Sequence, residues 1–301
     1  MDFRGVMTAI TTPFNDDLTI DHDFLAKHAN WLVDHGCTGI VPLGSLGEGN
    51  TLQFDEKLAI VETCVAALDG RAPVMPGISA LSTAEAVRIA RGSAERGAEA
   101  LMVLPPYVHN GKMHETRGHV AAIFEATDLP CMLYNNPFAY GVDILPGIIG
   151  ELAAEHPSLR AIKESSGDIR RITAVKALLG NRLEVFAGLD DMPYEAAWSG
   201  ATGWIAGLVN ALPAESVRLF ELAMAGRRQE AFELYAWFLP LLRMDTVPEF
   251  VQLIKLVQAE VGMGSETVRP PRQALPEADR SEALALIRER LAARPLSNVL
   301  N

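Results

Sequence analysis

The sequence is short of cysteines, of long apolar runs and of basic side chains, and each shortage excludes a class of protein. Its three cysteines, Cys37, Cys64 and Cys131, lie inside apolar runs. An odd number in such surroundings predicts buried thiols in a reducing compartment, not a disulfide framework. No apolar run approaches the roughly 18 residues that span a bilayer, and we expect no leader peptide because no charged-then-apolar stretch opens the chain. We therefore expect a cytoplasmic protein with no membrane partner.

Basic side chains are outnumbered, and the formal net charge is -12 at pH 7. Such a chain repels the phosphates of nucleic acids, so we expect no nucleic-acid partner. Common catalytic motifs are missing as well: there is no HExxH or Cys-His spacing for zinc, no G-x-S-x-G elbow and no G-x-x-x-x-G-K-[ST] loop. After the first apolar run stands Thr11-Thr12-Pro13-Phe14, where a dinucleotide-binding protein needs a glycine-rich loop. Because the zinc spacings are missing, we expect no metal site, and the missing glycine-rich loop argues against a dinucleotide-binding protein.

What the sequence contains is a regular alternation of short apolar runs and amphipathic stretches of helical period. The apolar runs are Val6–Ile10, Gly39–Leu43, Val74–Ile78, Ala100–Leu104, Cys131–Tyr134, Leu159–Lys163, Leu183–Ala187 and Gly203–Ala206. Strand and helix in alternation require a parallel sheet, because parallel neighbours need a crossover. Eight units of roughly 30 residues favour a closed (β/α)₈ barrel of the α/β class over an open sheet. Ser82-Thr83-Ala84-Glu85 predicts a helix start, and Gly36 and Gly97 predict helix ends.

The last third of the chain is different, because only helical patterns follow Gly207. They lie at about 213–225, 229–244, 247–261 and 280–293. We therefore divide the chain into a barrel, residues 1–210, and a C-terminal helical region, residues 211–301.

Lys163 ends the sixth apolar run and precedes a polar turn and a helix expected from about Arg170. In a mostly dry place an ammonium loses its hydration, which favours the free amine. A free amine can attack a carbonyl or imine and form a Schiff base. The alternative is a lysine that extends into water and has no chemical role.

Catalytic groups of such barrels lie at the carboxyl ends of the strands. The second strand leads to Gly44-Ser45-Leu46-Gly47-Glu48-Gly49, whose exposed N–H groups suit a carboxylate, or which is an ordinary glycine-rich loop. The fifth leads to Tyr134, a proton shuttle beside Lys163 or a core tyrosine. The seventh leads to Gly188, Asp190 and Asp191, which contact a substrate or cap a helix.

Taken together, these segments resemble the dihydrodipicolinate synthase and N-acetylneuraminate lyase superfamily over nearly the whole chain. The segments that carry the resemblance are Gly44-Ser45-Leu46-Gly47-Glu48, Tyr134-Asn135-Asn136-Pro137, Ile162-Lys163-Glu164 and Gly188-Leu189-Asp190-Asp191. The resemblance implies a barrel with C-terminal helices, a homotetramer and no cofactor. It also implies a lyase in which Lys163 forms the Schiff base and Tyr134 moves the proton. Ser45 and the N–H of Leu46 would bind the carboxylate of a 2-oxo acid such as pyruvate.

Members of the superfamily differ in substrate, and three activities stay open. The 4-hydroxy-tetrahydrodipicolinate synthases carry an arginine shortly after the Tyr-Asn-x-Pro motif and a tyrosine pair after strand 4. Here Phe138-Ala139-Tyr140-Gly141 contains no arginine, and Pro106-Tyr107-Val108 keeps only the first tyrosine. The neuraminate lyases also lack that arginine. They contact a sugar tail at positions that match Ser165, Gly188, Asp190 and Asp191, and we add Ile205 to this set. They differ in preferring threonine where this chain has Leu46.

The third activity belongs to the Δ1-pyrroline-4-hydroxy-2-carboxylate deaminases of hydroxyproline catabolism, and it is our first expectation. Residues 134–143, 244–246 and 264–272 most resemble that branch. In that reaction Lys163 would attack C2 of the cyclic imine, Tyr134 would take the C3 proton and Asp190 would orient the 4-hydroxyl. A non-catalytic sugar-acid binding module is the alternative outside the enzymes, because a fold does not fix a function.

Overall fold

The computed structural model describes residues 3–109 and 111–295. Within them eight strands form one sheet in the order β2-β1-β8-β7-β6-β5-β4-β3, and every pair is parallel. A parallel bridge between Ile40 and Val74 joins the two ends of this order, so the sheet closes on itself. The strands are β1 (Gly5–Thr8), β2 (Gly39–Ile40), β3 (Gly77–Ile78), β4 (Leu101–Val103), β5 (Cys131–Asn135), β6 (Leu159–Glu164), β7 (Glu184–Ala187) and β8 (Gly203–Ala206).

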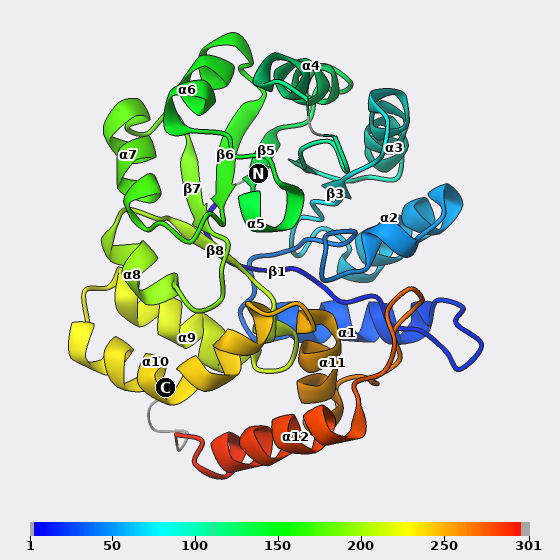
Figure 1. Cartoon of the computed structure of the whole chain (residues 1–301), viewed down its shortest axis with the longest axis vertical. Coiled ribbons are helices and arrows are strands. Elements are labelled where there is room, and N and C mark those ends of the chain that lie inside the picture. Colours follow the sequence, from blue (N-terminus) through cyan, green and yellow to red (C-terminus); the bar gives the residue numbers. More distant parts are fainter. Residues whose placement is uncertain (1–2, 110, 296–301) are drawn as a thin grey trace.

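Helices surround the strands (Figure 1). They are α1 (His22–Asp34), α2 (Phe54–Leu68), α3 (Thr83–Glu95), α4 (Met113–Phe124), α6 (Pro146–Glu155), α7 (Arg170–Leu179) and α8 (Pro193–Trp198), with the single turn α5 (Pro137–Tyr140) after β5. The expected start of α3 is confirmed, because the Ser82 side chain accepts a hydrogen bond from Glu85 N. Gly36 and Gly97 end their helices with φ of 94° and 86°, which suits glycine.

The expected barrel is confirmed, and each of the eight apolar runs overlaps its strand. Strands β2 and β3 are shorter than their runs. Pro42 follows one and Pro76 precedes the other, and a proline has no N–H to donate to a neighbouring strand.

Side chains fill the interior of the barrel. The register aligns Lys163 of β6 with Phe186 of β7, and Phe186 with Gly203 of β8. A Cβ atom on Gly203 would lie 2.2 Å from the Phe186 ring. The ring therefore occupies the space above the glycine, and the barrel has a packed core below its mouth.

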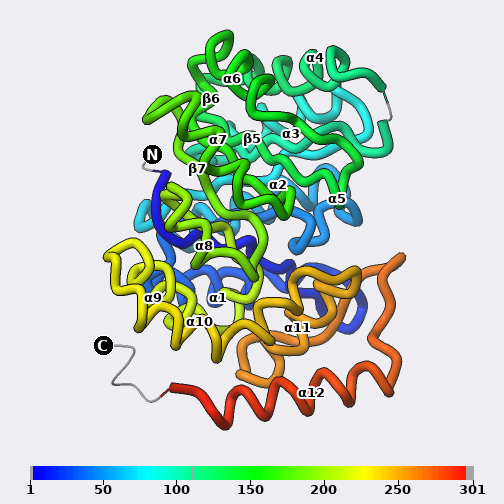
Figure 2. The backbone as a smooth tube through the Cα atoms, turned by 60° about the vertical axis from the view of Figure 1, so that its left-hand side comes forward, coloured from blue at the N-terminus to red at the C-terminus, as the bar shows by residue number. Residues whose placement is uncertain are grey.

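The helical tail packs against one side of the barrel, yellow to red in Figure 2. It consists of α9 (Pro213–Met224), α10 (Arg228–Leu242), α11 (Phe250–Glu260) and α12 (Glu277–Ala292). Apolar side chains of the barrel and of α9 to α12 belong to one buried cluster. The boundary between residues 210 and 211 stays a prediction. None of the described helices combines the length and the apolar composition needed to cross a membrane.

A buried ion pair joins the tail to the loop after β2. Glu48 is fully buried and Lys255 of α11 is 2% exposed, and Nζ of Lys255 lies 2.7 Å from Oε1 of Glu48. Lys255 also donates to the carbonyl of Thr267 at 2.7 Å, and Glu48 Oε2 accepts the N–H of Arg269 at 3.0 Å. Because both charges have several partners, removing one leaves the other buried without its counter-ion.

We predict that Lys255→Met lowers the free energy of unfolding by about 3–5 kcal/mol, the usual cost of an unpaired buried charge. Adding Glu48→Gln should recover part of that loss, because no charge then remains buried. Urea denaturation of the two variants and of the parent protein measures both effects. A double variant no more stable than Lys255→Met would contradict the ion-pair explanation.

Candidate active site

The side chains of Lys163 and Tyr134 lie next to each other on the inner face of two neighbouring strands. The register of β5 and β6 places Tyr134 directly beside Lys163. The ammonium nitrogen lies 4.3 Å from the centre of the phenol ring. Both residues are buried, with 6% and 5% of their surface exposed. The lysine therefore does not extend into bulk water, and its neighbour is the phenol expected from the sequence.

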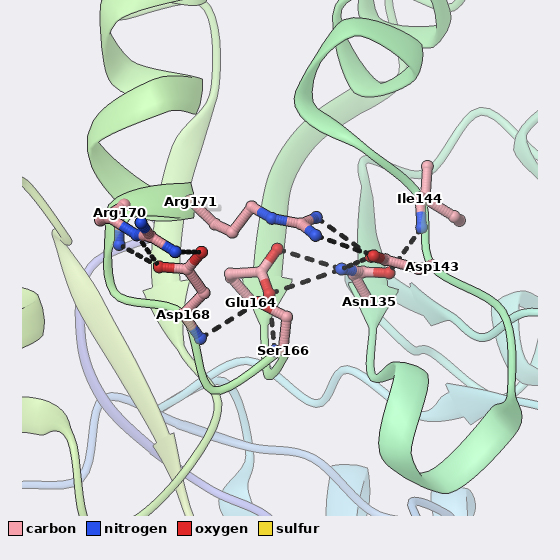
Figure 3. Close-up of polar contacts among 8 residues, drawn as sticks. All are labelled: Asn135, Asp143, Ile144, Glu164, Ser166, Asp168, Arg170 and Arg171. Atoms are coloured by element: carbon pink, nitrogen blue, oxygen red, sulfur yellow. Dashed lines mark hydrogen bonds and ion pairs between the residues drawn. The ribbon is translucent and has the colours of Figure 1, made fainter.

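A polar network on the outer face of the same two strands fixes this register (Figure 3). The next residue pair is Asn135 and Glu164, and Asn135 Nδ2 donates to Glu164 Oε2 at 3.1 Å. Asn135 Oδ1 accepts the N–H of Ile144 at 2.9 Å, and Glu164 Oε1 accepts the N–H of Ser166 at 2.6 Å. A slip of one residue between the two strands would turn Lys163 outward and break the Asn135–Glu164 hydrogen bond that joins them.

The network also ties α7 to the segment after β5. Arg171 donates to both carboxylate oxygens of Asp143 at 3.0 and 2.8 Å. These hydrogen bonds hold the pKa of Asp143 below its usual value, whereas burial raises the pKa of Glu164. The Arg171–Asp143 ion pair lies nearer to solvent than the buried carboxyl of Glu164, and the donors to Glu164 are neutral groups. The network therefore stabilises the site and adds little charge to it.

A single helical turn after β5 brings a second phenol to the mouth. Asn136 caps α5 by accepting the N–H of Ala139 at 3.0 Å, Pro137 occupies the first position, and Gly141 ends the turn with φ of 69°. Asn136 Nδ2 also donates to the hydroxyl of Tyr134 at 3.0 Å. The turn therefore folds Tyr140 back towards the barrel while Asn136 orients Tyr134.

Tyr140 connects Ser45 with the lysine site, a role that we did not expect from the sequence. Its hydroxyl shares a hydrogen bond with Ser45 Oγ. Its ring meets that of Tyr134 edge-on at a centroid distance of 5.7 Å, and the ring of Tyr107 lies at 5.3 Å. Burial, reinforced by Tyr134, raises the pKa of Tyr140 well above 10. The phenol therefore keeps its proton. The sequence feature that could have indicated the position of Tyr140 is the spacing of one helical turn between Pro137 and Gly141.

The loop after β2 has backbone N–H groups without an acceptor in the described part of the chain, and the anion site expected there stays a prediction. Among the described residues, the N–H groups of Ser45, Leu46 and Gly47 donate no hydrogen bond. The loop is held instead by Glu48 N and Gly49 N, which donate to the carbonyls of Ser45 and Gly44 at 3.1 Å each. Three successive free donors next to a serine hydroxyl suit a carboxylate.

Ser165 and Gly188 lie against Lys163. A Cβ atom on Gly188 would lie 1.9 Å from Ser165 Oγ and 2.9 Å from Lys163 Cγ. Only glycine leaves room there for both side chains. Ser165 Oγ is buried and has no partner among the described residues, so it is available to a bound molecule. Ile205 is buried on β8, in register with Met7.

Backbone N–H groups hold the carboxylate of Asp190, and its expected contact with a substrate hydroxyl stays a prediction. Its carboxylate accepts the N–H of Gly207 at 2.9 and 3.0 Å and that of Leu208 at 2.6 Å, and the residue is fully buried. Asp190 therefore fixes the end of β8. Asp191 lies 3.8 Å from the guanidinium of Arg243 and accepts a hydrogen bond from Tyr235 through its carbonyl.

No cysteine competes with the lysine as nucleophile. Cys37, Cys64 and Cys131 are free and buried, as expected, and burial raises the pKa of each thiol to about 12. In the described part of the chain, no group of three or more His, Cys, Asp or Glu side chains is placed to hold a metal ion.

Comparisons with known proteins agree with this geometry. The family model of the dihydrodipicolinate synthetase family matches residues 2–290. The 4-hydroxy-tetrahydrodipicolinate synthase of Pelobacter propionicus is 31% identical over 286 residues, which cover 95% of this chain and 98% of that protein. The corresponding enzyme of Methanothrix thermoacetophila is 32% identical over 282 residues, 93% of this chain and 94% of its own.

Solved structures give the same result. A dihydrodipicolinate synthase from Acinetobacter baumannii, complexed with pyruvate, has a TM-score of 0.91 at 28% identity and covers 96% of this chain and 99% of its own. The enzyme from Aquifex aeolicus has a TM-score of 0.91 at 26% identity, with 95% and 98% covered. This chain is thus an enzyme, a lyase of the class that works through a lysine Schiff base, and it belongs to the dihydrodipicolinate synthetase family.

Proposed function

We propose that this chain acts on a small 2-oxo acid or its cyclic imine, with the amine of Lys163 as the nucleophile. The observation that carries the proposal is the buried amine 4.3 Å from the Tyr134 ring. The amine is held out of bulk water beside the phenol, where a lysine nucleophile can attack C2 of a carbonyl or imine. The similar enzyme from Acinetobacter baumannii was solved in complex with pyruvate, a 2-oxo acid, which supports this substrate class.

The neighbouring groups suit the steps that follow attack. The free N–H groups of residues 45–47 would hold the substrate carboxylate and place its C2 atom towards the lysine. The lysine iminium then acts as an electron sink and acidifies the C3 proton. Tyr134, oriented by Asn136, is the group placed to move that proton, and the Tyr140–Ser45 hydrogen bond keeps the second phenol beside it.

Two reactions are candidates within this chemistry. The relatives are named 4-hydroxy-tetrahydrodipicolinate synthases, which supports that activity. Deamination of Δ1-pyrroline-4-hydroxy-2-carboxylate is favoured by residues at the mouth instead. Ala139 offers no cation for a second carboxylate, and Val108 is 88% exposed at the position where a synthase would carry its second tyrosine. Nothing in the described site favours a long sugar acid or a role in binding alone.

We further propose a homotetramer in the cytoplasm. Trp198 and Phe232 are about half exposed on α8 and α10. Arg228 lies 5.7 Å from the centre of the Trp198 ring, and the centre of the Tyr194 ring lies 6.0 Å from that of Phe232. Exposed aromatic side chains in a group support a contact with another subunit, and the buried free thiols suit a reducing compartment.

We predict that Lys163→Ala abolishes turnover, because no other described amine lies beside Tyr134. The assay panel contains hydroxypyrroline carboxylate, N-acetylneuraminate, and aspartate semialdehyde with pyruvate, and it follows ammonia, pyruvate and semialdehyde. Release of ammonia and semialdehyde identifies the deaminase, and condensation identifies the synthase. Lys176→Ala, on the outer helix α7, is the control. Residual turnover of Lys163→Ala equal to that control would refute the proposal.

Loss of the two phenol hydroxyls should lower kcat to different extents. Tyr134→Phe should lower kcat by roughly 10²-fold or more, the usual loss of a general acid–base group. Tyr140→Phe removes one hydrogen bond to Ser45, worth about 1 kcal/mol, so we expect a loss of about 5-fold to 10-fold. Steady-state kinetics compare both with Tyr194→Phe on α8. Equal rates for Tyr134→Phe and that control would exclude Tyr134 as the proton shuttle.

A further inference from the structure

The C-terminal region places one carboxyl group, that of Asp245, inside the mouth of the barrel. Asp245 ends the short turn Arg243–Asp245 that follows α10. A Cβ atom on Gly207, directly after β8, would lie 2.2 Å from Asp245 Oδ1 and 3.1 Å from Leu46 Cδ2. The carboxyl therefore lies between the end of β8 and the carboxylate loop after β2, on the side of the mouth away from β5.

The Asp245 carboxyl has no hydrogen-bond partner among the residues that the structure describes, although it is partly buried. Its neighbour Arg243 is directed to Asp191, at 3.8 Å. The charged groups that act on Asp245 are Asp190, Asp191 and Lys163. An unpaired carboxyl that shares a site with a buried amine is a candidate for a chemical role, because structural carboxylates usually have partners.

The groups around Asp245 determine whether its carboxyl is protonated or ionised. Burial raises the pKa of Asp190 to about 6, but the N–H groups of Gly207 and Leu208 that hydrogen-bond its carboxylate favour the ionised form. Burial first and the charge of Asp190 second raise the pKa of Asp245 well above its usual value, and Lys163 opposes them. Two close carboxyls rarely ionise together. Asp245 is therefore the protonated member of the pair.

We propose that Asp245 is a catalytic acid that protonates the hydroxyl leaving C4 of a 2-oxo acid bound to Lys163. The inference rests on the proposed Schiff base and deepens it, because it names the substrate class as 4-hydroxy-2-oxo acids and their cyclic imines, and the reaction as elimination.

The electron and proton movements balance. Tyr134 passes the C3 proton on to solvent, and the substrate becomes an enamine with a double bond between C2 and C3. The nitrogen pair then re-forms the iminium, the C2–C3 pair becomes a C3–C4 double bond, and the C4–O bond breaks. The departing oxygen takes the Asp245 proton and leaves as water, and the carboxylate regains a proton from the water that hydrolyses the iminium. Cleavage of the C3–C4 bond would instead need a base for the hydroxyl proton, which a protonated Asp245 does not supply.

Asp245→Asn separates the two halves of this reaction. Exchange of the methyl protons of pyruvate in D₂O, followed by NMR, reports iminium and enamine formation without a leaving group. Elimination is measured with hydroxypyrroline carboxylate and with 4-hydroxy-2-oxoglutarate. We expect elimination to fall by roughly 10²-fold or more, with methyl exchange unchanged. Asp168→Asn, a carboxylate paired with Arg170 at the same end of the barrel, should alter neither rate.

Each other outcome overturns a defined claim. Unchanged elimination in Asp245→Asn would refute the acid role, and so would an equal fall of exchange and elimination, because Asp245 would then support the site as a whole. Wild-type protein that exchanges pyruvate protons but only cleaves 4-hydroxy-2-oxoglutarate to pyruvate and glyoxylate would refute the Asp245 inference and leave the Schiff base intact. Wild-type protein with no exchange would refute both.

Discussion

The lateral pairing of β5 and β6 is the constraint on which the site depends. Parallel register sets Tyr134 beside Lys163 on the inner face and Asn135 beside Glu164 on the outer face. The outer hydrogen bonds make that register unique, since a slip of one residue would reverse every side chain. Backbone geometry therefore holds the amine and the phenol together, and the packed ring of Phe186 closes the interior beneath them.

The C-terminal region contributes to the same site from far along the chain. The Glu48–Lys255 ion pair holds the loop after β2, in which three successive N–H groups donate no hydrogen bond within the described part of the chain. Asp245 enters the mouth from the turn after α10. Stability of the tail and chemistry of the barrel are therefore coupled, because the same loop is fixed by one part of the tail and lies against another.

The sequence predicted the barrel, because eight apolar runs alternate with helical patterns, and it predicted the neighbours Lys163 and Tyr134 from family motifs. It did not predict Tyr140, whose place depends on one short turn, or Asp245, whose place depends on how α10 packs. It also did not predict the partners of the Asp190 carboxylate, because the N–H groups of Gly207 and Leu208 follow the next strand. Local sequence patterns predict strands and motifs, whereas contacts between segments far apart in the sequence are seen only in the folded structure.

Reductive trapping tests the central claim most directly. The protein is incubated with pyruvate, reduced with borohydride and digested, and the modified peptide is identified by mass spectrometry. The account predicts a single adduct on Lys163, because this lysine combines burial with a phenol neighbour. An adduct on another lysine, such as the buried Lys57 or Lys255, or no adduct at all, would contradict it.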